Sequence, residues 1–407
     1  MAEFSPLPVL HYIGSLTRGG AEEHLLTLLQ GMDPRRFELH LACAPELMAR
    51  LEADLPPSVR RLPLRLRPGD WRSAAAFCQY LRRHRIAVAH SHLFFSSRLA
   101  SPLARWCGAR TVETPHVRES WRRGWRSWYA PDRLLGRAVD VYIAVSRANA
   151  TYLIEEKRLP AHKVRVVPNG IALRRFLKLP DRERLRREHG WDPQACIVLS
   201  AARLEPQKGH AVLLEALAQI RAVCPRLRLV CAGEGSCRPA LAGLTARLGL
   251  ENQVQWVGYQ NPIEPWLAMA DVFVLPSFYE GLPLAAMEAM AAGLAVVASA
   301  VDGTRELIES GRNGWLLPPG NAGEFAQALQ SLYRDAELRR RLGREARAWA
   351  FQNCGADRQL RATGRIYLQL SRNGRPEATS AVTMPAERET ESWAAPATAS
   401  SRARRWA

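Results

Sequence analysis

Two glutamates in the C-terminal half of the chain are spaced like ligand-binding residues rather than like a catalytic acid–base pair. Glu280 lies in the segment 278–283 (FYEGLP), directly after an apolar run, and Glu288 lies in the following stretch of Ala and Met. This pattern predicts a strand, a turn at Gly281 and a helix over 284–292, with Pro283 at its beginning, because Pro is tolerated in the first turn of a helix. The two carboxylates then reach different depths of one ligand that has hydroxyl groups at both ends.

The helix predicted around Glu288 suits a buried carboxylate and a bound anion. It is apolar on all sides (AAMEAMAA), so Glu288 is expected to be buried and to need a hydrogen-bonding partner. The helix N-terminus offers free backbone N–H groups to an anion such as phosphate, and Gly281 and Leu282 lie where the chain approaches that anion closely. The alternative interpretation is that Glu280 caps the helix and Glu288 lies on a solvated face.

Two cations follow another predicted strand. Arg203 and Lys208 lie in the segment 201–209 (AARLEPQKG), between a strand and a helix. Cations at the carboxyl end of a parallel strand, beside a helix N-terminus, form a clamp for a diphosphate. The segment lacks the Gly-rich pattern of a Walker loop, so ATP binding of that kind is not indicated. The alternative is that both are surface cations of an arginine-rich chain.

Two further candidates lie at strand ends in the N-terminal half. Gly19 and Gly20 separate the first predicted strand from a helix and suit close approach of a ligand, and His116 follows a strand in the segment 114–117 (TPHV). Polar side chains at the carboxyl ends of parallel strands face the crevice in which such folds bind ligands. A histidine in that position can bond the hydroxyl groups of a sugar.

A metal site is not expected from the sequence. His90 and His92 end another predicted strand, but no nearby Asp, Glu or Cys completes a metal site around them. The chain also contains no Asp-x-Asp motif, which disfavours a diphosphate held by a metal ion. We therefore expect neither a metal nor another cofactor.

The rest of the chain predicts the scaffold that positions these residues. Apolar runs typical of buried strands alternate with helical patterns, which indicates α/β architecture with doubly wound parallel sheets, and the alternation restarts after the segment 164–170 (VRVVPNG). We predict two Rossmann-like domains over residues 1–175 and 176–351, then a helix over 352–372. Apolar periodicity is lost over 373–407, which predicts a disordered tail.

Composition and charge narrow the surroundings in which the protein works. The chain has 407 residues and a formal net charge of +18, which favours anionic partners. No apolar run approaches the roughly 20 residues of a membrane span, and no signal-peptide pattern opens the sequence. The eight cysteines form no C-x-x-C pair and several lie in apolar runs, as expected in a reducing compartment. We expect a cytoplasmic protein, with peripheral attachment to the inner face of the cytoplasmic membrane as a second option.

Residues 117–129 (VRESWRRGWRSWY) are the candidate for such attachment. On a helix, Trp121, Trp125 and Trp128 would share one face with arginines beside them, which suits a bilayer interface that contains acidic lipids. The alternative is an ordinary helix that packs its Trp face inward. No helix-turn-helix, zinc-finger or RNA-binding pattern supports a nucleic-acid partner.

Taken together, these residues resemble the retaining glycosyltransferases of family 4, the group 1 glycosyl transferases, which have the GT-B fold. The resemblance covers about residues 7–372. It departs from the family at Ala172, where members often have Asp, and at Leu282-Pro283 in place of the common Phe-Gly, which bears on the sugar pocket. The segments that carry it are Gly19-Gly20-Ala21-Glu22, Pro168-Asn169-Gly170-Ile171, Arg203 with Lys208-Gly209, Gly233-Glu234-Gly235, Glu280-Gly281 with 288–293 (EAMAAG), and Gly311-Arg312-Asn313-Gly314.

The resemblance implies a donor site in the second domain. Arg203 and Lys208 would bind the diphosphate of a nucleotide-sugar donor. Glu288 would hold its ribose, and Glu280 would hold its sugar.

The resemblance also implies roles in the first domain. His116 would contact the transferred sugar near the reacting centre, and Gly19 and Gly20 would border the phosphates or the acceptor. The helix over 352–372 would cross back to the first domain.

The implied activity is a retaining, metal-independent transfer of a sugar from a UDP- or GDP-type donor to a hydroxyl group of a glycan or lipid-linked acceptor. The basic charge and residues 117–129 favour cell-envelope polysaccharide, lipopolysaccharide or glycolipid biosynthesis as the setting. Two other interpretations stay open. One is a nucleotide-sugar epimerase or hydrolase of the same fold, and the other is a basic, non-enzymatic protein that binds membrane or nucleic acid.

Overall fold

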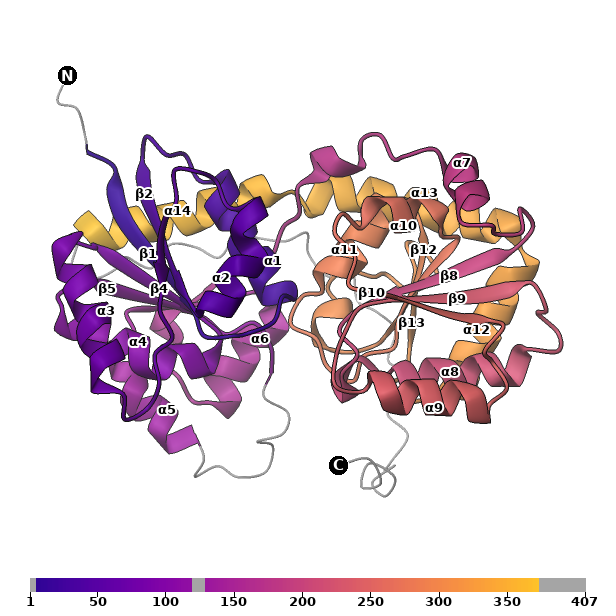
Figure 1. Cartoon of the computed structure of the whole chain (residues 1–407), viewed down its shortest axis with the longest axis horizontal. Coiled ribbons are helices and arrows are strands. Elements are labelled where there is room, and N and C mark those ends of the chain that lie inside the picture. The colour runs from indigo at the N-terminus through magenta and orange to yellow at the C-terminus, as the bar shows by residue number, and fades with distance from the viewer. Residues whose placement is uncertain (1–4, 119–128, 373–407) are drawn as a thin grey trace.

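The computed structural model describes residues 5–118 and 129–372, which form two parallel β-sheets flanked by helices (Figure 1). The two sheets lie side by side, and each belongs to its own α/β unit. This arrangement confirms the predicted fold class of two doubly wound parallel-sheet domains. We refer to them as the first and the second domain.

The first sheet has seven parallel strands in the order β3-β2-β1-β4-β5-β6-β7. The order reverses between β1 and β4, and in such sheets ligands bind outside the carboxyl ends of the strands at that point. The strands are β1 (Leu7–Ile13), β2 (Phe37–Cys43), β3 (Arg60–Pro63), β4 (Val88–His92), β5 (Arg110–Thr114), β6 (Val141–Ala144) and β7 (Val164–Val166).

Helices cover both faces of the first sheet. One core cluster joins α1 and α2 to the sheet, and a second cluster, on the other face, joins α3 and α4 to it. The helices are α1 (Gly20–Gly31), α2 (Pro45–Leu51), α3 (Trp71–Arg83), α4 (Phe94–Trp106), α5 (Ala130–Leu135) and α6 (Arg147–Thr151), and a π-helical turn over Tyr152–Glu156 continues α6.

The second sheet has six parallel strands in the order β10-β9-β8-β11-β12-β13, with its reversal between β8 and β11. Its strands are β8 (Cys196–Ala201), β9 (Leu227–Ala232), β10 (Val254–Gly258), β11 (Val272–Leu275), β12 (Ala295–Ser299) and β13 (Trp315–Leu317). Its helices are α7 (Arg182–Glu188), α8 (His210–Ile220), α9 (Arg238–Arg247), α10 (Glu264–Met269), α11 (Leu284–Ala291), α12 (Ala322–Arg334) and α13 (Ala336–Asn353).

The last described helix, α14 (Ala356–Arg372), follows α13 but packs on the first domain, against α1 and β4 (yellow in Figure 1). Its Tyr367 is fully buried in the core cluster of α1 and β1, and its hydroxyl lies 2.5 Å from His90 Nδ1. Where α14 crosses α1, a Cβ atom on Gly31 would overlap the side chain of Leu360, so glycine allows the close packing. The chain therefore enters the second domain once and returns.

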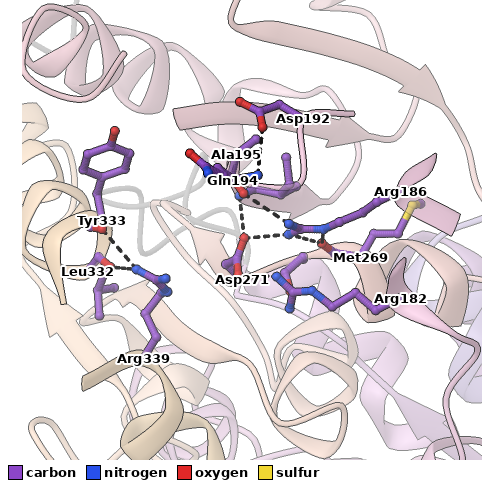
Figure 2. Close-up of polar contacts among 12 residues, drawn as sticks. Arg182, Arg186, Asp192, Gln194, Ala195, Met269, Asp271, Leu332, Tyr333 and Arg339 are labelled. Carbon is purple, nitrogen blue, oxygen red and sulfur yellow. Dashed lines mark hydrogen bonds and ion pairs between the residues drawn. The ribbon is translucent and has the colours of Figure 1, made fainter. Parts of the chain in front are cut away.

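A buried ion network fixes α7 to the start of the central strands of the second sheet (Figure 2). Arg186 Nη2 is 2.7 Å from Asp271 Oδ2 and also donates a hydrogen bond to Met269 O, while Arg182 pairs with the other oxygen of Asp271. Burial alone would raise the pKa of Asp271, but the two guanidinium groups outweigh it and hold the pKa below its usual value. This network lies away from the strand ends that carry the candidate site, so we assign it a structural role.

Two predictions fall on residues outside the described ranges. Most of the Trp- and Arg-rich segment 117–129 and the whole of the predicted tail over 373–407 lie there. Within the described ranges, no helix combines the length and the apolar character needed to cross a bilayer. All eight cysteines lie within the described ranges and none forms a disulfide.

Candidate active site

Glu280 and Lys208 meet at the carboxyl edge of the second sheet. Lys208 Nζ lies 2.6 Å from Glu280 Oε1, and Ser277 Oγ donates a hydrogen bond of 2.6 Å to the same oxygen. Glu280 is only 4% exposed. Lys208 follows β8 and Glu280 follows β11, which is the neighbouring strand. The topology therefore joins the carboxylate predicted to hold a sugar to a cation predicted to bind a diphosphate.

Hydrogen bonds to backbone carbonyl groups hold these two loops together. The N–H of Phe278 donates to Gln207 O over 2.8 Å, and Gln207 Nε2 donates to Tyr279 O over 2.8 Å. Gly209 has a φ of +65°, and a Cβ atom there would overlap the carbonyl oxygen of Pro276. The loops after β8 and β11 therefore form one rigid unit at the carboxyl ends of these strands, which we call the loop pair.

Glu288 has a partner that the sequence did not single out. Its Oε1 lies 3.0 Å from Arg175 Nη1, and Arg175 also binds both carboxylate oxygens of Glu264 over 2.7 and 2.9 Å. Burial raises the pKa of Glu288 to about 7; Arg175 acts against this rise, and Glu23 and Glu264 add to it. Because Glu23 belongs to the first domain, Glu288 is within electrostatic reach of both domains.

The two departures from the resembled family have visible structural effects. Ala172 precedes the 3-10 turn Leu173–Phe176 that carries Arg175, and this turn has no side-chain cap, whereas Asp in that position is a favourable cap. Pro283 is the N-cap of α11, which starts at Leu284, as predicted. The N-terminus of α11 still follows Gly281 and Leu282 directly, as expected.

His116 is where the first domain contacts the loop after β11. It follows β5 and is 7% exposed. A Cβ atom on Gly281 would overlap His116 O, so only glycine permits the approach of the two backbones. Burial, and to a lesser degree His24, lower the pKa of the His116 ring well below its usual value, so the ring is neutral at neutral pH.

Arg203 reaches across to the glycine turn of the first domain. Gly19 is the N-cap of α1, and a Cβ atom there would lie 3.3 Å from Arg203 Cδ and 3.4 Å from Glu22 Oε2. Gly20 has no atom within 4 Å of its Cβ position, so the first turn of α1 is open. A guanidinium group beside free helix N–H groups suits a diphosphate.

Four buried histidines lie around His116 and form a cluster of five with it. His92 Nε2 lies 3.0 Å from His11 Nδ1, His92 Nδ1 lies 3.4 Å from His116 Nε2, and the rings of His24 and His116 are 4.6 Å apart. The remaining member, His90, contacts Thr114 Oγ1 over 2.7 Å. Burial lowers the pKa of every ring, to about 3 for His11 and to about 4 for His24. We call these residues the histidine cluster.

The histidine cluster corrects one step of the argument against a metal. The ring nitrogens of His11, His90 and His92 lie within 4.8 Å of one another, and so do those of His24, His92 and His116. His11 of β1 is therefore a third side chain that could ligate a metal beside His90 and His92, whereas the prediction from the sequence considers only Asp, Glu and Cys as the completing residue. Both nitrogens of His92 contact other imidazoles, so the rings already form a hydrogen-bonded network.

Asn169 connects the histidine cluster to the loop of the second domain that carries Glu280, Gly281 and Leu282. Its Oδ1 lies 2.8 Å from His24 Nδ1, and its Nδ2 donates to Leu282 O over 2.9 Å. Gln359 of α14 supports this link, because its Oε1 accepts a 2.7 Å hydrogen bond from the N–H of Gly170. The segment between the domains thus contacts the candidate residues on both sides.

Most of the residues predicted from the sequence come together at the facing edges of the two sheets. Glu288 joins them less directly, through Arg175 and the charge of Glu23. The predicted residues at the facing edges are Gly19, Gly20, His116, Arg203, Lys208, Glu280, Gly281 and Leu282. The contributing residues that were not predicted are Glu22, His24, Asn169, Arg175 and Ser277.

Comparison with known proteins adds two family matches that together span most of the described chain. Residues 181–349 match the family described as Glycosyl transferases group 1, and residues 18–175 match Glycosyltransferase Family 4. A D-inositol 3-phosphate glycosyltransferase of Streptomyces scabiei is 34% identical over 304 residues, which cover 69% of this chain and 67% of that protein. An alpha-D-kanosaminyltransferase of Streptomyces kanamyceticus is 28% identical over 294 residues, which cover 68% of this chain and 69% of that protein.

A solved structure shares the architecture. Alr3699/HepE of Anabaena, in complex with UDP-glucose, superposes with a TM-score of 0.79 at 22% sequence identity, over 88% of this chain and 99% of that one. At this identity the likeness concerns the fold.

Proposed function

Because this chain belongs to the group 1 glycosyltransferases and has the GT-B fold, we propose that it transfers a sugar from a UDP- or GDP-type donor to a hydroxyl group of a glycan or lipid-linked acceptor. We propose further that the anomeric configuration is retained, that no metal takes part, and that the product belongs to cell-envelope polysaccharide or glycolipid biosynthesis. Membership of an EC 2.4 family removes the non-enzymatic interpretation and that of an epimerase or hydrolase. The UDP-glucose bound to the Anabaena protein supports a UDP-sugar as the first donor to test.

The observation that carries the donor assignment is that one loop after β8 supplies both cations: Lys208 pairs with Glu280, and Arg203 lies beside Gly19 at the open start of α1. The diphosphate would lie between the two cations and the N–H groups beside Gly20. Glu280 would accept hydrogen bonds from the sugar, and Glu288 would accept them from the ribose. These roles use carboxylates as hydrogen-bond acceptors and cations as charge partners, without a hydrolytic acid–base pair.

The proposed chemical step needs charge stabilisation more than it needs a protein base. When the bond between the anomeric carbon and the diphosphate oxygen breaks, negative charge grows on the diphosphate, where Arg203 and Lys208 stabilise it. The acceptor oxygen bonds the anomeric carbon from the face that the diphosphate leaves, and its proton passes to a departing phosphate oxygen. His116, neutral through burial, bonds a sugar hydroxyl group and does not act as an acid.

Thermal unfolding with UDP, GDP and ADP tests the donor site. One of the three is expected to raise the melting temperature of the wild type, because a ligand that binds only the folded state stabilises it. Arg203→Ala and Lys208→Ala should abolish this rise and lower UDP release from UDP-glucose by roughly 100-fold. The matched control is Arg247→Ala, an exposed cation on α9. Stabilisation by none of the nucleotides, or full turnover in both variants, would show that the assignment is wrong.

A further inference from the structure

A pocket of about 520 Å³ lies between the two domains, beside the loop that carries Glu280. The first domain lines it with Arg118 and the start of α6, and the second domain lines it with Phe278, Tyr279 and the turn around Asp302. Tyr279 directly precedes Glu280. In the turn around Asp302, a Cβ atom on Gly303 would overlap Gly281 O, so this turn is in direct contact with the loop that carries Glu280 and Gly281. We call this space the arginine pocket.

The acidic groups of the arginine pocket are already engaged. The two carboxylate oxygens of Glu306 accept the backbone N–H groups of Arg147 and Ala148, over 3.1 and 2.9 Å. Asp302 lies 3.6 Å from Arg118 Nη1, and Arg118 pairs with Glu156 as well. These carboxylates therefore have their partners within the protein, and none of them forms an ion pair with Arg147 or Arg305.

Two further guanidinium groups of the pocket have no acidic partner. Among the described residues, the Arg147 side chain makes no hydrogen bond or ion pair, and the only contact of Arg305 is a 3.0 Å hydrogen bond from Nε to Ala300 O. Both side chains are exposed. The pocket thus presents two unpaired positive charges to whatever enters it from solvent, close to the proposed reacting centre.

An aromatic surface lies beside these charges. The side chain of Phe278 is 48% exposed, although its backbone N–H donates to Gln207 O and so joins the loops after β8 and β11. An exposed aromatic face suits the apolar face of a sugar ring, and a guanidinium fork suits the oxygens of a phosphate. The combination fits one ligand that contains both groups.

We propose that the arginine pocket binds the acceptor and selects an acceptor whose sugar carries a phosphate group. This inference rests on the proposed function. A phosphate monoester carries a charge of about −1.5 to −2 near neutral pH, which the two free guanidinium groups match. The phosphate belongs either to a soluble sugar phosphate, which is a monoester, or to a lipid headgroup, in which it is a diester with a single negative charge; both present phosphoryl oxygens to Arg147 and Arg305.

Calorimetric titration with glucose 6-phosphate and with glucose, both with saturating UDP present, tests the soluble source. UDP keeps the phosphate probe out of the diphosphate site. Binding of glucose 6-phosphate should exceed that of glucose, and Arg147→Ala with Arg305→Ala should weaken it by roughly 10- to 100-fold, as expected for lost hydrogen bonds to a charged group. Lysine at both positions should restore part of the affinity. The double variant Arg361→Ala with Arg365→Ala removes the same charge from the exposed face of α14 and should bind normally.

Sedimentation with phosphatidylcholine vesicles, with and without phosphatidylinositol, tests the lipid-linked source with the same variants. If the protein binds selectively to the inositol-containing vesicles and the Arg147/Arg305 double variant does not, the result supports the proposal that the arginine pocket binds a lipid-linked acceptor. If neither probe binds, or if the double variant binds as well as the wild type, the proposal is overturned. Arg203→Ala keeps the two ideas apart, because it should lose the response to UDP and keep the response to the vesicles.

Discussion

At the scale of single residues, Glu288 links donor binding to pH. Its pKa of about 7 lies above the ordinary value because burial penalises the charged form more than Arg175 favours it, and Glu23 and Glu264 add repulsion. The folded protein therefore holds this proton more tightly than the unfolded chain. The stability that Glu288 contributes is complete below the ordinary glutamate pKa and is lost as the pH rises through about 7.

We expect the free energy of unfolding of the wild type, relative to that of Glu288→Gln, to fall between about pH 5 and pH 8. The fall should be at most about 3 kcal/mol, since the glutamine does not titrate. Denaturant unfolding of both proteins across this range measures it. A difference that stays constant with pH would show that the carboxyl group is ionised in the fold at all these values.

The same proton should act on donor binding in the opposite direction. An ionised carboxylate accepts stronger hydrogen bonds than a neutral acid, so the affinity for UDP-glucose should rise as the pH passes about 7 in the wild type. In Glu288→Gln this rise should be absent and the affinity low throughout. Titration calorimetry at several pH values checks the expectation, and an equal rise in both proteins would contradict it.

Sequence reasoning found those residues whose position in a strand–loop–helix unit is informative by itself. Arg203 and Lys208 could be predicted because a cation just after a buried strand faces the ligand edge. Arg175 could not, because it follows Arg174 in a short turn and only the packing of that turn against α11 selects it. His24 shows the same limit, since in the sequence it is one polar residue of an amphipathic helix.

At the scale of elements, α14 ties the end of the described chain to the candidate site. Its N-terminus passes the segment between the domains so closely that a Cβ atom on Gly170 would lie 2.6 Å from Ala356 Cα and 2.8 Å from Gly355 O. Further along, Tyr367 contacts His90 of the histidine cluster. The helix thus holds both the inter-domain segment and the strand ends in place.

Gly170→Ala should therefore destabilise the protein by about 1–3 kcal/mol, the range for overpacking, because backbone atoms cannot yield as a flexible side chain does. The melting temperature should fall, and protease should cleave α14 more readily. Gly243→Ala is the matched control, since its Cβ would meet only Arg247 Nη1 at 3.5 Å inside α9, where alanine favours the helix. Equal stability of the two variants would mean that α14 does not need this close crossing.

The histidine cluster allows a second prediction at this scale. Its rings are neutral and several of their nitrogens bond one another and their neighbours, whereas Nε2 of His11 and Nε2 of His24 have no hydrogen-bond partner among the described residues. We expect the protein to fold and work without an ion at these two nitrogens. Exhaustive treatment with a chelator should leave the melting temperature and UDP release unchanged. Zinc found by metal analysis, together with a fall in both quantities that added zinc reverses, would instead make His24, His92 and His116 a metal centre.

The elements themselves were predictable to different degrees. Long apolar strands such as β1 and β8 are recognisable because both faces of a covered sheet are apolar. The three residues of β13 are only partly buried and form no such run. The return of α14 to the first domain followed from the family resemblance and not from its own pattern, since an amphipathic helix does not state which surface it will cover.

At the scale of the whole molecule, a few specific contacts set how the two domains face each other. Glu306 of the second domain accepts the backbone N–H groups of Arg147 and Ala148 at the start of α6. Asn169 donates to Leu282 O, and Tyr259 OH donates to Glu23 Oε1 over 3.1 Å. Such contacts span different domains, so no local pattern in the sequence predicts them. They keep His116 against Gly281, the approach on which the proposed donor site depends.

The clearest test of this arrangement is Glu306→Ala. Without the carboxylate, the N–H groups at the start of α6 lose their acceptors, a loss of about 0.5–2 kcal/mol for a helix start, and the domains are less strongly held together. In solution, small-angle scattering should show a larger radius of gyration that UDP-glucose reduces again, and KM for the donor should rise more than kcat falls. The control Glu309→Ala removes an exposed acid whose partner is the equally exposed Arg312. If both variants give the scattering and the turnover of the wild type, Glu306 does not hold the two domains in place. Apolar packing would then maintain the domain arrangement, and the role of Glu306 would be limited to lining the arginine pocket.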